Sequence, residues 1–249
     1  PVSCGGGDNM MGAIGTGNVT DGKLTMSLGT SGTLYAYSSK PIIDPKGAIA
    51  GFCSSTDGWL PLLCTMNCTV ATELMRDLVG RSLDEFNNDL NSIPPGSGGL
   101  LTIPFFNGER TPNLPKGKAS LIGLTSQNCT PAYVLRSAVE GATYALRYGL
   151  DELSALGLKV DKIILTGGGA KSPQWRQIVA DIFHLPIQIL KIEEGASFGA
   201  ALQALWVLIR EKDSNIKLDT IITDHLAVDE GKSSLPNLEC KDIYNKGYS

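Results

Sequence analysis

The segment between residues 162 and 209 constrains the fold most strongly. A short apolar, β-prone run, Lys162–Thr166, leads directly into the glycine-rich turn TGGGAKSP. Ser172 then stands where a helix N-cap is expected, with Pro173 at the first helical position. A second strand is expected over 186–190 and a second helix over 196–209. Strand, turn, helix, strand and helix in this order are typical of α/β folds, and the sequence therefore predicts an α/β domain.

Three helices of the second half are predicted from their apolar spacing. Between Pro131 and Leu156 apolar residues recur every three or four positions, which indicates a long helix with one buried face. The helix after Pro173 is expected to bury Trp175, Ile178, Val179 and Ile182. The run over 196–209 is apolar nearly all round, so we expect that helix to be buried inside the domain.

The first half is strand-like at its start. Leu24, Met26 and Leu28 alternate with polar residues, and GTSG follows at Gly29–Gly32 before a second β-prone run over 33–37. This order predicts a hairpin. We also expect a strand over 48–53, helices over 66–79 and 83–90, and a short buried strand over 100–106. The tail after residue 213 is more polar and gives no clear pattern.

Composition excludes several classes of protein. The chain has 249 residues, 42% of them hydrophobic and 18% charged, and a net charge of -4 with a pI near 5.2. An acidic chain argues against a broad nucleic-acid surface. The longest apolar run, over 196–209, falls short of the ~20 residues that span a bilayer, so no membrane partner is expected.

Cysteine and histidine are too sparse to suggest a metal centre. A chain of this size does not need disulfides, so its six cysteines are expected to be reduced thiols in a cytoplasmic protein. Cys64 and Cys68 lie four apart in a predicted helix, with no second pair and no nearby histidine, which argues against zinc. With only His184 and His225 present, acid–base chemistry is better assigned to a carboxylate.

Three glycine-rich turns are the candidate binding elements. They are Gly5–Gly7, Gly29–Gly32 and Gly167–Gly169, each placed at the end of an expected strand. Without a Cβ, such turns let backbone N–H groups converge on an anion, and the third also opens a helix. Together they suggest a polyphosphate. Taken singly, each is as well explained by a turn or by close strand–helix packing.

The standard phosphate-binding motifs do not fit. GGGAKS ends like a Walker A loop, but Ala170 stands where its second glycine belongs and Leu165 where its first belongs. GAIGTG has its glycines in the wrong order for a dinucleotide fingerprint. If a nucleotide binds, another fold holds it.

Four motifs in order resemble the carboxy-terminal half of the FGGY carbohydrate kinases. They are GGGDNMMGAIGTG, MSLGTSGTLY, GERTP and LTGGGAKSPQWRQIVADIF, and the resemblance runs from Val2 to about Arg210. It implies an actin-like (ribonuclease H-like) α/β domain, a mixed sheet flanked by helices, over residues 1–249. The family has two such domains, so this chain would lack its amino-terminal sugar-binding partner domain and would be inactive alone.

The resemblance also implies roles for particular residues. Asp8 would be the catalytic base on the sugar hydroxyl and would lie near Mg2+, through a water, while Asn9 would touch the sugar. The ATP phosphates would be held by the Gly29–Gly32 turn. Phosphate and adenosine would be contacted by the turn at Gly167–Gly169, and the nucleotide pocket would be lined by the stretch around residue 69. These nucleotide residues are Gly29, Thr30, Ser31, Asn67, Thr69, Glu73, Gly168, Gly169 and Ala170. Alternatively, Asp8 is a turn or cap residue with no catalytic role.

The substrate suggested by the resemblance is a pentulose. GERTP after PFF resembles the xylulokinase branch of the family more than the glycerol kinase branch, which implies transfer of a phosphoryl group from ATP to D-xylulose. Other FGGY substrates (glycerol, ribulose or gluconate) and an actin-like nucleotide-binding module without a sugar remain alternatives. Arg110 is either a cleft cation or half of a surface ion pair. The oligomeric state is open, with a homodimer as one option.

Overall fold

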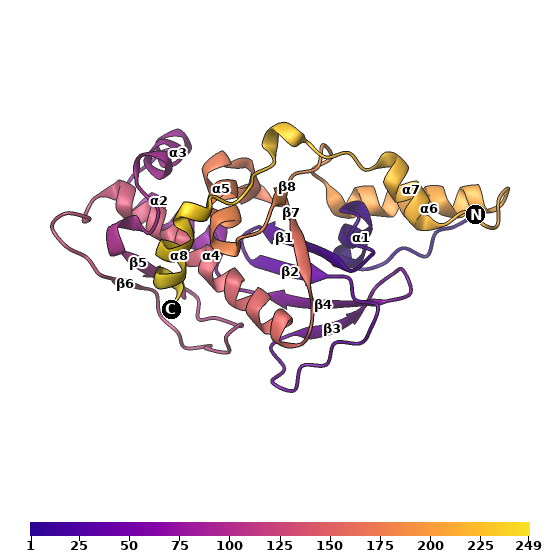
Figure 1. Ribbon diagram of the computed structural model, residues 1–249, viewed down its shortest axis with the longest axis horizontal. Coiled ribbons are helices and arrows are strands. Elements are labelled where there is room, and N and C mark those ends of the chain that lie inside the picture. Colours follow the sequence, from indigo (N-terminus) through magenta and orange to yellow (C-terminus); the bar gives the residue numbers. More distant parts are fainter.

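A six-stranded mixed sheet lies at the centre of the computed structural model, which describes residues 1–249 (Figure 1). Its strand order is β3-β4-β2-β1-β7-β8, antiparallel from β3 to β1 and parallel from β1 to β8. The strands are β1 (Gly22–Leu28), β2 (Gly32–Ala36), β3 (Ala50–Cys53), β4 (Trp59–Cys64), β7 (Val160–Thr166) and β8 (Ile187–Gln188). A separate hairpin joins β5 (Leu101–Ile103) to β6 (Ser120–Ile122).

Helices cover both faces and both ends of this sheet (Figure 1). They are α1 (Asp8–Gly15), α2 (Thr69–Leu78), α3 (Leu83–Ser92), α4 (Pro131–Ala155), α5 (Pro173–Phe183), α6 (Gly195–Arg210), α7 (Leu218–His225) and α8 (Lys241–Tyr248). Short 3-10 turns occur at η1 (Ser97–Gly99), η2 (Gly168–Lys171), η3 (Glu230–Lys232) and η4 (Leu238–Cys240). The predicted mixed sheet flanked by helices is confirmed. None of the helices combines the length and apolarity needed to cross a membrane.

The β1–β2 hairpin, α4 and the β7–turn–α5 unit were all predicted, whereas β4 was not. The reason is Pro61, which lacks an N–H group and argues against a strand inside a sheet. In the structure Leu62–Cys64 pair with β2, while Pro61 lies beyond that stretch and is paired only with Gly51 of β3. Because Pro61 sits where β4 has one neighbour, its missing donor is tolerated.

The two faces of the sheet have different chemistry because side chains alternate along a strand. Leu24, Met26 and Leu28 of β1 join the main core beneath α4 and α5, together with Ile163 and Leu165 of β7. The intervening residues point to the opposite face and are largely hydroxylated. They are Thr25, Ser27, Thr33, Tyr35 and Thr166. One face therefore builds the main core. The other carries these hydroxyl groups and, toward β4, a small apolar cluster of Ala13, Tyr35, Leu60 and Leu62.

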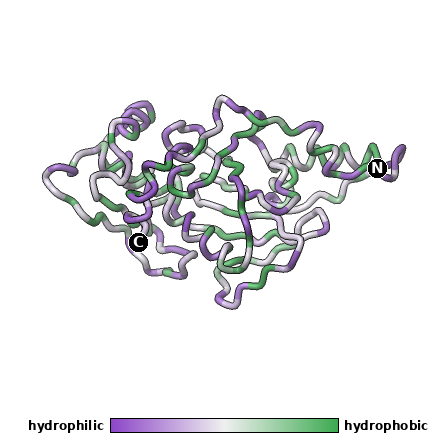
Figure 2. Tube along the Cα trace, in the orientation of Figure 1, coloured by the Kyte–Doolittle hydropathy of each residue, from purple (hydrophilic) through white to green (hydrophobic).

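The expectation that the 196–209 helix is buried is wrong. Only Gly199, Leu202 and Gln203 of α6 are buried, and Leu208 is 51% exposed. With α1 and α7, this helix forms a small second core at one end of the molecule, beside the amino terminus (Figures 1 and 2). An all-round apolar pattern shows that a helix is hydrophobic, but not how many neighbouring layers cover it.

Glycines allow α1 and α6 to pack with their backbones in contact. A Cβ added at Gly199 would lie 1.8 Å from the Met11 carbonyl oxygen, and one added at Gly15 would lie 1.9 Å from the Gly195 carbonyl oxygen. Such distances are below any real Cβ contact. The close approach of these helices therefore requires glycine at both positions.

The tail after residue 213 is tied to the domain by a buried polar network. Arg136 and Glu140 of α4 form an ion pair with Nε and Oε1 2.9 Å apart, and the Tyr244 hydroxyl of α8 bonds to both. Burial raises the pKa of Glu140, and the Arg136 guanidinium opposes that shift. The Ser97 hydroxyl also donates to Glu140, at 2.7 Å, so η1, α4 and α8 are held together.

The cysteines are free thiols, but Cys64 and Cys68 are not in one helix as expected. Cys64 ends β4, and Cys68 is the residue before α2. The apolar run preceding α2 is strand and turn, which is why the helix begins three residues later than predicted.

Replacing Gly199 with alanine should lower the free energy of unfolding by about 1–3 kcal/mol, the usual cost of overpacking. The added methyl group has no space beside the Met11 carbonyl. Gly195→Ala, on the same helix, is the matched control, because its Cβ would meet Thr16 Cγ2 at 3.4 Å and the Gly12 carbonyl oxygen at 3.9 Å, which are ordinary contacts. Urea denaturation of both variants tests this, and equal midpoints would contradict the close packing.

Candidate functional site

Two glycine turns lie at the same edge of the sheet because β1 and β7 run parallel. Ser27 pairs with Thr166, so both strands end side by side. The first turn, Gly29–Ser31, connects β1 to β2, and the second, Gly167–Gly169, connects β7 to the 3-10 turn η2. The sequence predicted correctly that each of these two turns follows a strand, and the structure shows that the two strands are neighbours.

Gly5–Gly7, the remaining glycine run, does not follow a strand as expected. It belongs to an irregular segment that leads into α1, with Gly5 at φ 68° and Gly7 as the residue before the helix. The Gly5 N–H donates to Gln203 Oε1 of α6 at 2.9 Å, and the Ser3 hydroxyl bonds to the same oxygen. The segment before Asp8 is thus fixed to α6.

The first turn presents donors and hides acceptors. The Thr69 N–H donates to the Gly29 carbonyl at 2.9 Å, and the Cys68 N–H donates to the Thr30 carbonyl at 3.1 Å. The N–H groups of Thr30 and Ser31 donate to no group of the chain. Both side chains are exposed, so this turn offers free N–H and hydroxyl groups to a ligand.

In the second turn, two of the three glycines serve packing, which was the alternative explanation. Gly167 has φ 88°, and a Cβ there would lie 2.7 Å from the Leu28 carbonyl oxygen. A Cβ at Gly169 would lie 2.8 Å from Leu28 Cβ and 3.0 Å from the Trp175 ring. Only at Gly168 would a Cβ meet nothing within 4 Å. Gly168 is therefore the one glycine of this turn with open space at the position of a side chain.

The far end of the second turn is held by α5. The Arg176 Nη1 group donates to the Ala170 carbonyl at 2.9 Å and to the Lys171 carbonyl at 3.3 Å. Ser172 Oγ accepts the Trp175 N–H at 3.3 Å, as predicted for an N-cap. These hydrogen bonds to α5 hold the end of the turn in place and thereby fix the position of Gly168.

Asp8 and Asn9 line a pocket of about 400 Å³, which we call the aspartate pocket. Its other walls include the hydroxyl side chains Ser27, Ser31, Thr33 and Thr166, and also the carboxylates of Glu193 and Glu194. Asp8 is exposed, makes no ion pair, and uses only Oδ1, which accepts the Asn9 N–H at 2.8 Å. Its second oxygen is free. A free carboxylate therefore faces a hydroxyl-rich wall and the first glycine turn.

A neighbouring pocket, the α2–α5 pocket, is lined by Thr69, Gly168 and Gly169. Glu73 also lines it, as expected, but Asn67 does not. Asn67 is buried, and its Nδ2 donates to the Gly108 carbonyl at 2.6 Å. The sequence did not indicate the remaining walls, which come from α2, α3, the end of η2 and the start of α5. They are Thr72, Arg76, Leu83, Phe86, Asn87, Lys171, Ser172 and Trp175.

GERTP is part of the scaffold behind these pockets. Glu109 is 1% exposed and accepts N–H groups from Met66 at 2.6 Å and Arg110 at 2.8 Å. Asn67 Nδ2 donates to its other oxygen at 3.0 Å. Arg110 is exposed and makes no ion pair, so the surface ion-pair explanation is wrong. Glu109 thus fixes the segment that leads into α2.

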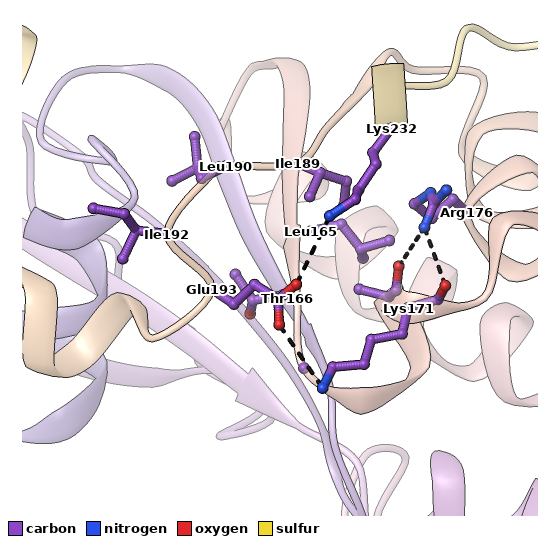
Figure 3. Close-up of a pocket in the computed structure, with 11 residues that line it drawn as sticks. Leu165, Thr166, Lys171, Arg176, Ile189, Leu190, Ile192, Glu193 and Lys232 are labelled. Atoms are coloured by element: carbon purple, nitrogen blue, oxygen red, sulfur yellow. Dashed lines mark hydrogen bonds and ion pairs between the residues drawn. The ribbon is translucent and has the colours of Figure 1, made fainter. Parts of the chain in front are cut away.

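Ala170 lines a third pocket, the lysine pocket, on the other side of the second turn (Figure 3). Glu193 lies between Lys171 at 3.8 Å and Lys232 at 3.9 Å. Lys171 also lines the α2–α5 pocket, and Thr166 also lines the aspartate pocket. The three pockets therefore adjoin at the second glycine turn.

The structure thus divides the predicted site residues among these pockets. Asp8, Asn9 and Ser31 lie together, Thr69, Gly168 and Gly169 lie together, and Ala170 is in the third pocket. Gly29 and Thr30 line none of the three, although they form the turn beside Ser31. No group of three or more His, Cys, Asp or Glu side chains is arranged to hold a metal ion.

Comparison with known proteins identifies what this arrangement resembles. Residues 24–208 match the model of the carboxy-terminal domain of the FGGY family of carbohydrate kinases. The chain is 46% identical over 247 residues to the xylulose kinase of Haemophilus influenzae, covering 99% of this chain and 49% of that protein. It is 40% identical over 217 residues to the xylulose kinase of Streptomyces rubiginosus, covering 84% and 42%. The chain therefore spans about half the length of these relatives.

A solved structure confirms the predicted fold class. The xylulose kinase from Bifidobacterium adolescentis matches with a TM-score of 0.82 at 34% identity, over 99% of this chain and 47% of that chain. The fold is thus the actin-like, ribonuclease H-like one of the sugar kinases, and the mixed sheet described above is its central element.

Gly169→Val should destabilise the domain by about 1–3 kcal/mol, because its side chain would be forced into Leu28 and Trp175. Gly168→Val, one residue away, should change the unfolding midpoint much less, since its Cβ meets open space. Thermal unfolding followed by circular dichroism compares the two. If Gly168→Val proved the more destabilising variant, the assignment of Gly169 to packing would be wrong.

Proposed function

This chain belongs to the FGGY family of carbohydrate kinases, and we propose on that basis that it forms the ATP-binding half of a kinase for D-xylulose. The product is D-xylulose 5-phosphate. Relatives named xylulose kinase, at up to 46% identity, support this substrate over other sugars of the family. The observation that carries the proposal is Asp8, a free carboxylate in one pocket with Ser31 and Thr166.

The proposed domain organisation follows from the coverage of the relatives. Residues 1–249 constitute the carboxy-terminal, ATP-binding domain, and the other half of the relatives corresponds to an amino-terminal, sugar-binding domain. The active site then lies in a cleft between the two domains, bordered on this side by the aspartate pocket. The aspartate pocket is open and polar, which supports its place at a domain cleft, because the second domain would supply the opposite wall.

Asp8 acts as the base in this scheme. It takes the proton from the attacking sugar hydroxyl as that oxygen approaches the γ-phosphorus of ATP. Its Oδ1 is engaged by the Asn9 N–H, which leaves the second oxygen to accept the proton. Neither His184 nor His225 lines the pocket. Glu193 and Glu194 also line it, but Glu193 is paired with Lys171 and Lys232, whereas the Asp8 carboxylate is in no ion pair. Asn9, beside it, contacts the sugar.

The phosphates are bound by the donors of the two turns. The free N–H groups of Thr30 and Ser31 and the Ser31 hydroxyl point to phosphate oxygens, and Gly29 lets the turn form. The adenosine occupies the α2–α5 pocket, where Thr69, Gly168 and Gly169 form one side and Trp175 the other. Ala170 continues the nucleotide contact at the end of the turn.

The donor set at Asp8 fits magnesium. Mg2+ usually keeps several waters and binds one or two carboxylates together with substrate phosphates, without an all-protein cage. The exposed Asp8 carboxylate, without a group of three or more acidic, His or Cys side chains arranged around an ion, fits that mode of binding. When bound, the ion neutralises charge on the phosphates. Asp8 would hold it through a water.

Asp8→Asn should reduce kcat of the full-length kinase by about 10²–10⁴-fold, the usual contribution of a general base. The amide keeps the shape and the contact to Asn9 but cannot take a proton. ADP release with xylulose, and calorimetry with ATP, should show lost turnover with ATP affinity preserved. A variant with normal kcat would reject Asp8 as the base.

Gly168→Val should weaken the affinity for ATP about tenfold, equivalent to about 1.4 kcal/mol, while the KM for the sugar changes little. The valine side chain extends into the α2–α5 pocket, where no protein atom lies within 4 Å of the Cβ. Gly51→Val on β3 is the matched control, because its nearest neighbour is at 3.7 Å and it lines none of these pockets. Equal ATP affinity in both variants would place the nucleotide elsewhere.

A further inference from the structure

The lysine pocket has no role in the proposed reaction except at Ala170 and Thr166. It is lined by three cationic side chains from three separate elements: Lys171 of η2, Arg176 of α5 and Lys232 of η3 (Figure 3). Glu193 is the only carboxylate that lines it. The lining therefore has an excess of positive charge. Its remaining walls are apolar, with Leu165, Ile189 and Leu190 among them.

Arg176 is the cation with unused donors. It is 8% exposed, and only its Nη1 group makes hydrogen bonds, to the Ala170 and Lys171 carbonyls. Its Nε is buried and has no partner. Burial lowers the pKa of Arg176, because the charged form loses solvation. A buried guanidinium without an anion is costly, so this position is suited to receive one.

Glu193 does not supply that anion. It is 54% exposed and shares its two oxygens between Lys171 and Lys232 at the outer rim, at distances close to 4 Å. Asp229 pairs with Lys232 at 3.4 Å and does not line the pocket. The rim lysines are thus partly neutralised by protein carboxylates, while Arg176 at the wall keeps its charge uncompensated by an ion pair.

We propose that the lysine pocket binds a small organic carboxylate. Its oxygens accept hydrogen bonds from the Arg176 guanidinium and from Lys232, in the planar geometry that arginine offers to carboxylates. Its apolar body lies against Leu165, Ile189 and Leu190. The cavity volume is about 120 Å³, and since an engineered cavity of about 150 Å³ holds benzene, the ligand has about six non-hydrogen atoms.

This site is separate from the nucleotide contacts but adjoins them. Lys171 lines both the lysine pocket and the α2–α5 pocket, and Thr166 lines both the lysine pocket and the aspartate pocket. The Arg176 contacts to Ala170 and Lys171 hold the turn that borders the nucleotide. A carboxylate at Arg176 therefore lies behind that turn, on the side away from the adenosine.

Calorimetric titration of this chain with butyrate tests the proposal. Ionic strength is kept constant with sodium chloride, so that screening does not mimic binding. Butyrate should bind saturably at one site. Butanol, with the same apolar body and no charge, and inorganic phosphate, with charge and no apolar body, should each bind at least about tenfold more weakly, about 1.4 kcal/mol. Equal behaviour of butyrate and butanol would overturn the proposal.

Substitutions locate the site. Lys232→Met should weaken the affinity for butyrate severalfold. Lys212→Met, at an exposed lysine outside the pocket, should leave that affinity unchanged. Arg176→Lys keeps a positive charge but loses the planar pair of donors, and it should weaken butyrate further, with folding checked by circular dichroism. If Lys232→Met and Lys212→Met bind equally well, the lysine pocket is not the site.

A final titration separates this site from the nucleotide site. With saturating Mg–ADP, butyrate should still bind with a similar stoichiometry. Loss of butyrate binding under that condition would mean that the anion had occupied the phosphate positions, and the proposal would fail. The titration without nucleotide does not depend on kinase activity, so it can succeed or fail independently of the proposed function.

Discussion

The backbone contact between α1 and α6 determines where the candidate base lies. Gly15 and Gly199 remove the two side chains that would hold the helices apart. Gln203 of α6 then accepts hydrogen bonds from Ser3 and Gly5, so the segment that leads into α1 is also held by α6. Asp8 is the first residue of α1, and its position is therefore inherited from α6, nearly two hundred residues away in sequence.

The sheet separates stability from chemistry by its alternation of side chains. Leu24, Met26 and Leu28 are completely buried against the α4 side, while Ser27, one step along, lines the aspartate pocket. The same division holds in β7, where Leu165 belongs to the core and Thr166 to the pocket. Since a one-residue slip would exchange the faces, the register that builds the core also sets the hydroxyl wall.

Local signals in the sequence predicted the elements that depend on neighbouring residues. The strand before Gly167, the Ser172 N-cap and the buried face of α5 follow from spacing within about twenty residues, and all three are confirmed. The exposure of α6 could not be derived in this way, because it depends on how many layers cover that helix. Strand β4 was not predicted. It contains Pro61, and whether a sheet tolerates a proline depends on which neighbouring strand the proline faces.

The same distinction applies to the site. The two glycine turns were predicted because each follows its own strand. The walls opposite them, formed by Phe86, Asn87 and Trp175, come from helices that meet only in the folded domain. The role of Gly169 also depended on a distant contact, since Leu28 occupies the space its side chain would need.

The bonds that α2 makes to the first turn also set the direction of its peptide dipoles. The Gly29 and Thr30 carbonyls accept the N–H groups of Thr69 and Cys68 at the start of α2, so the N–H ends of the same two peptide units, at Thr30 and Ser31, point away from α2 before anything binds. An arriving anion finds these dipoles already oriented, so little reorganisation opposes binding. The outward direction of these N–H groups is thus built into the folded chain by the hydrogen bonds between the turn and the start of α2.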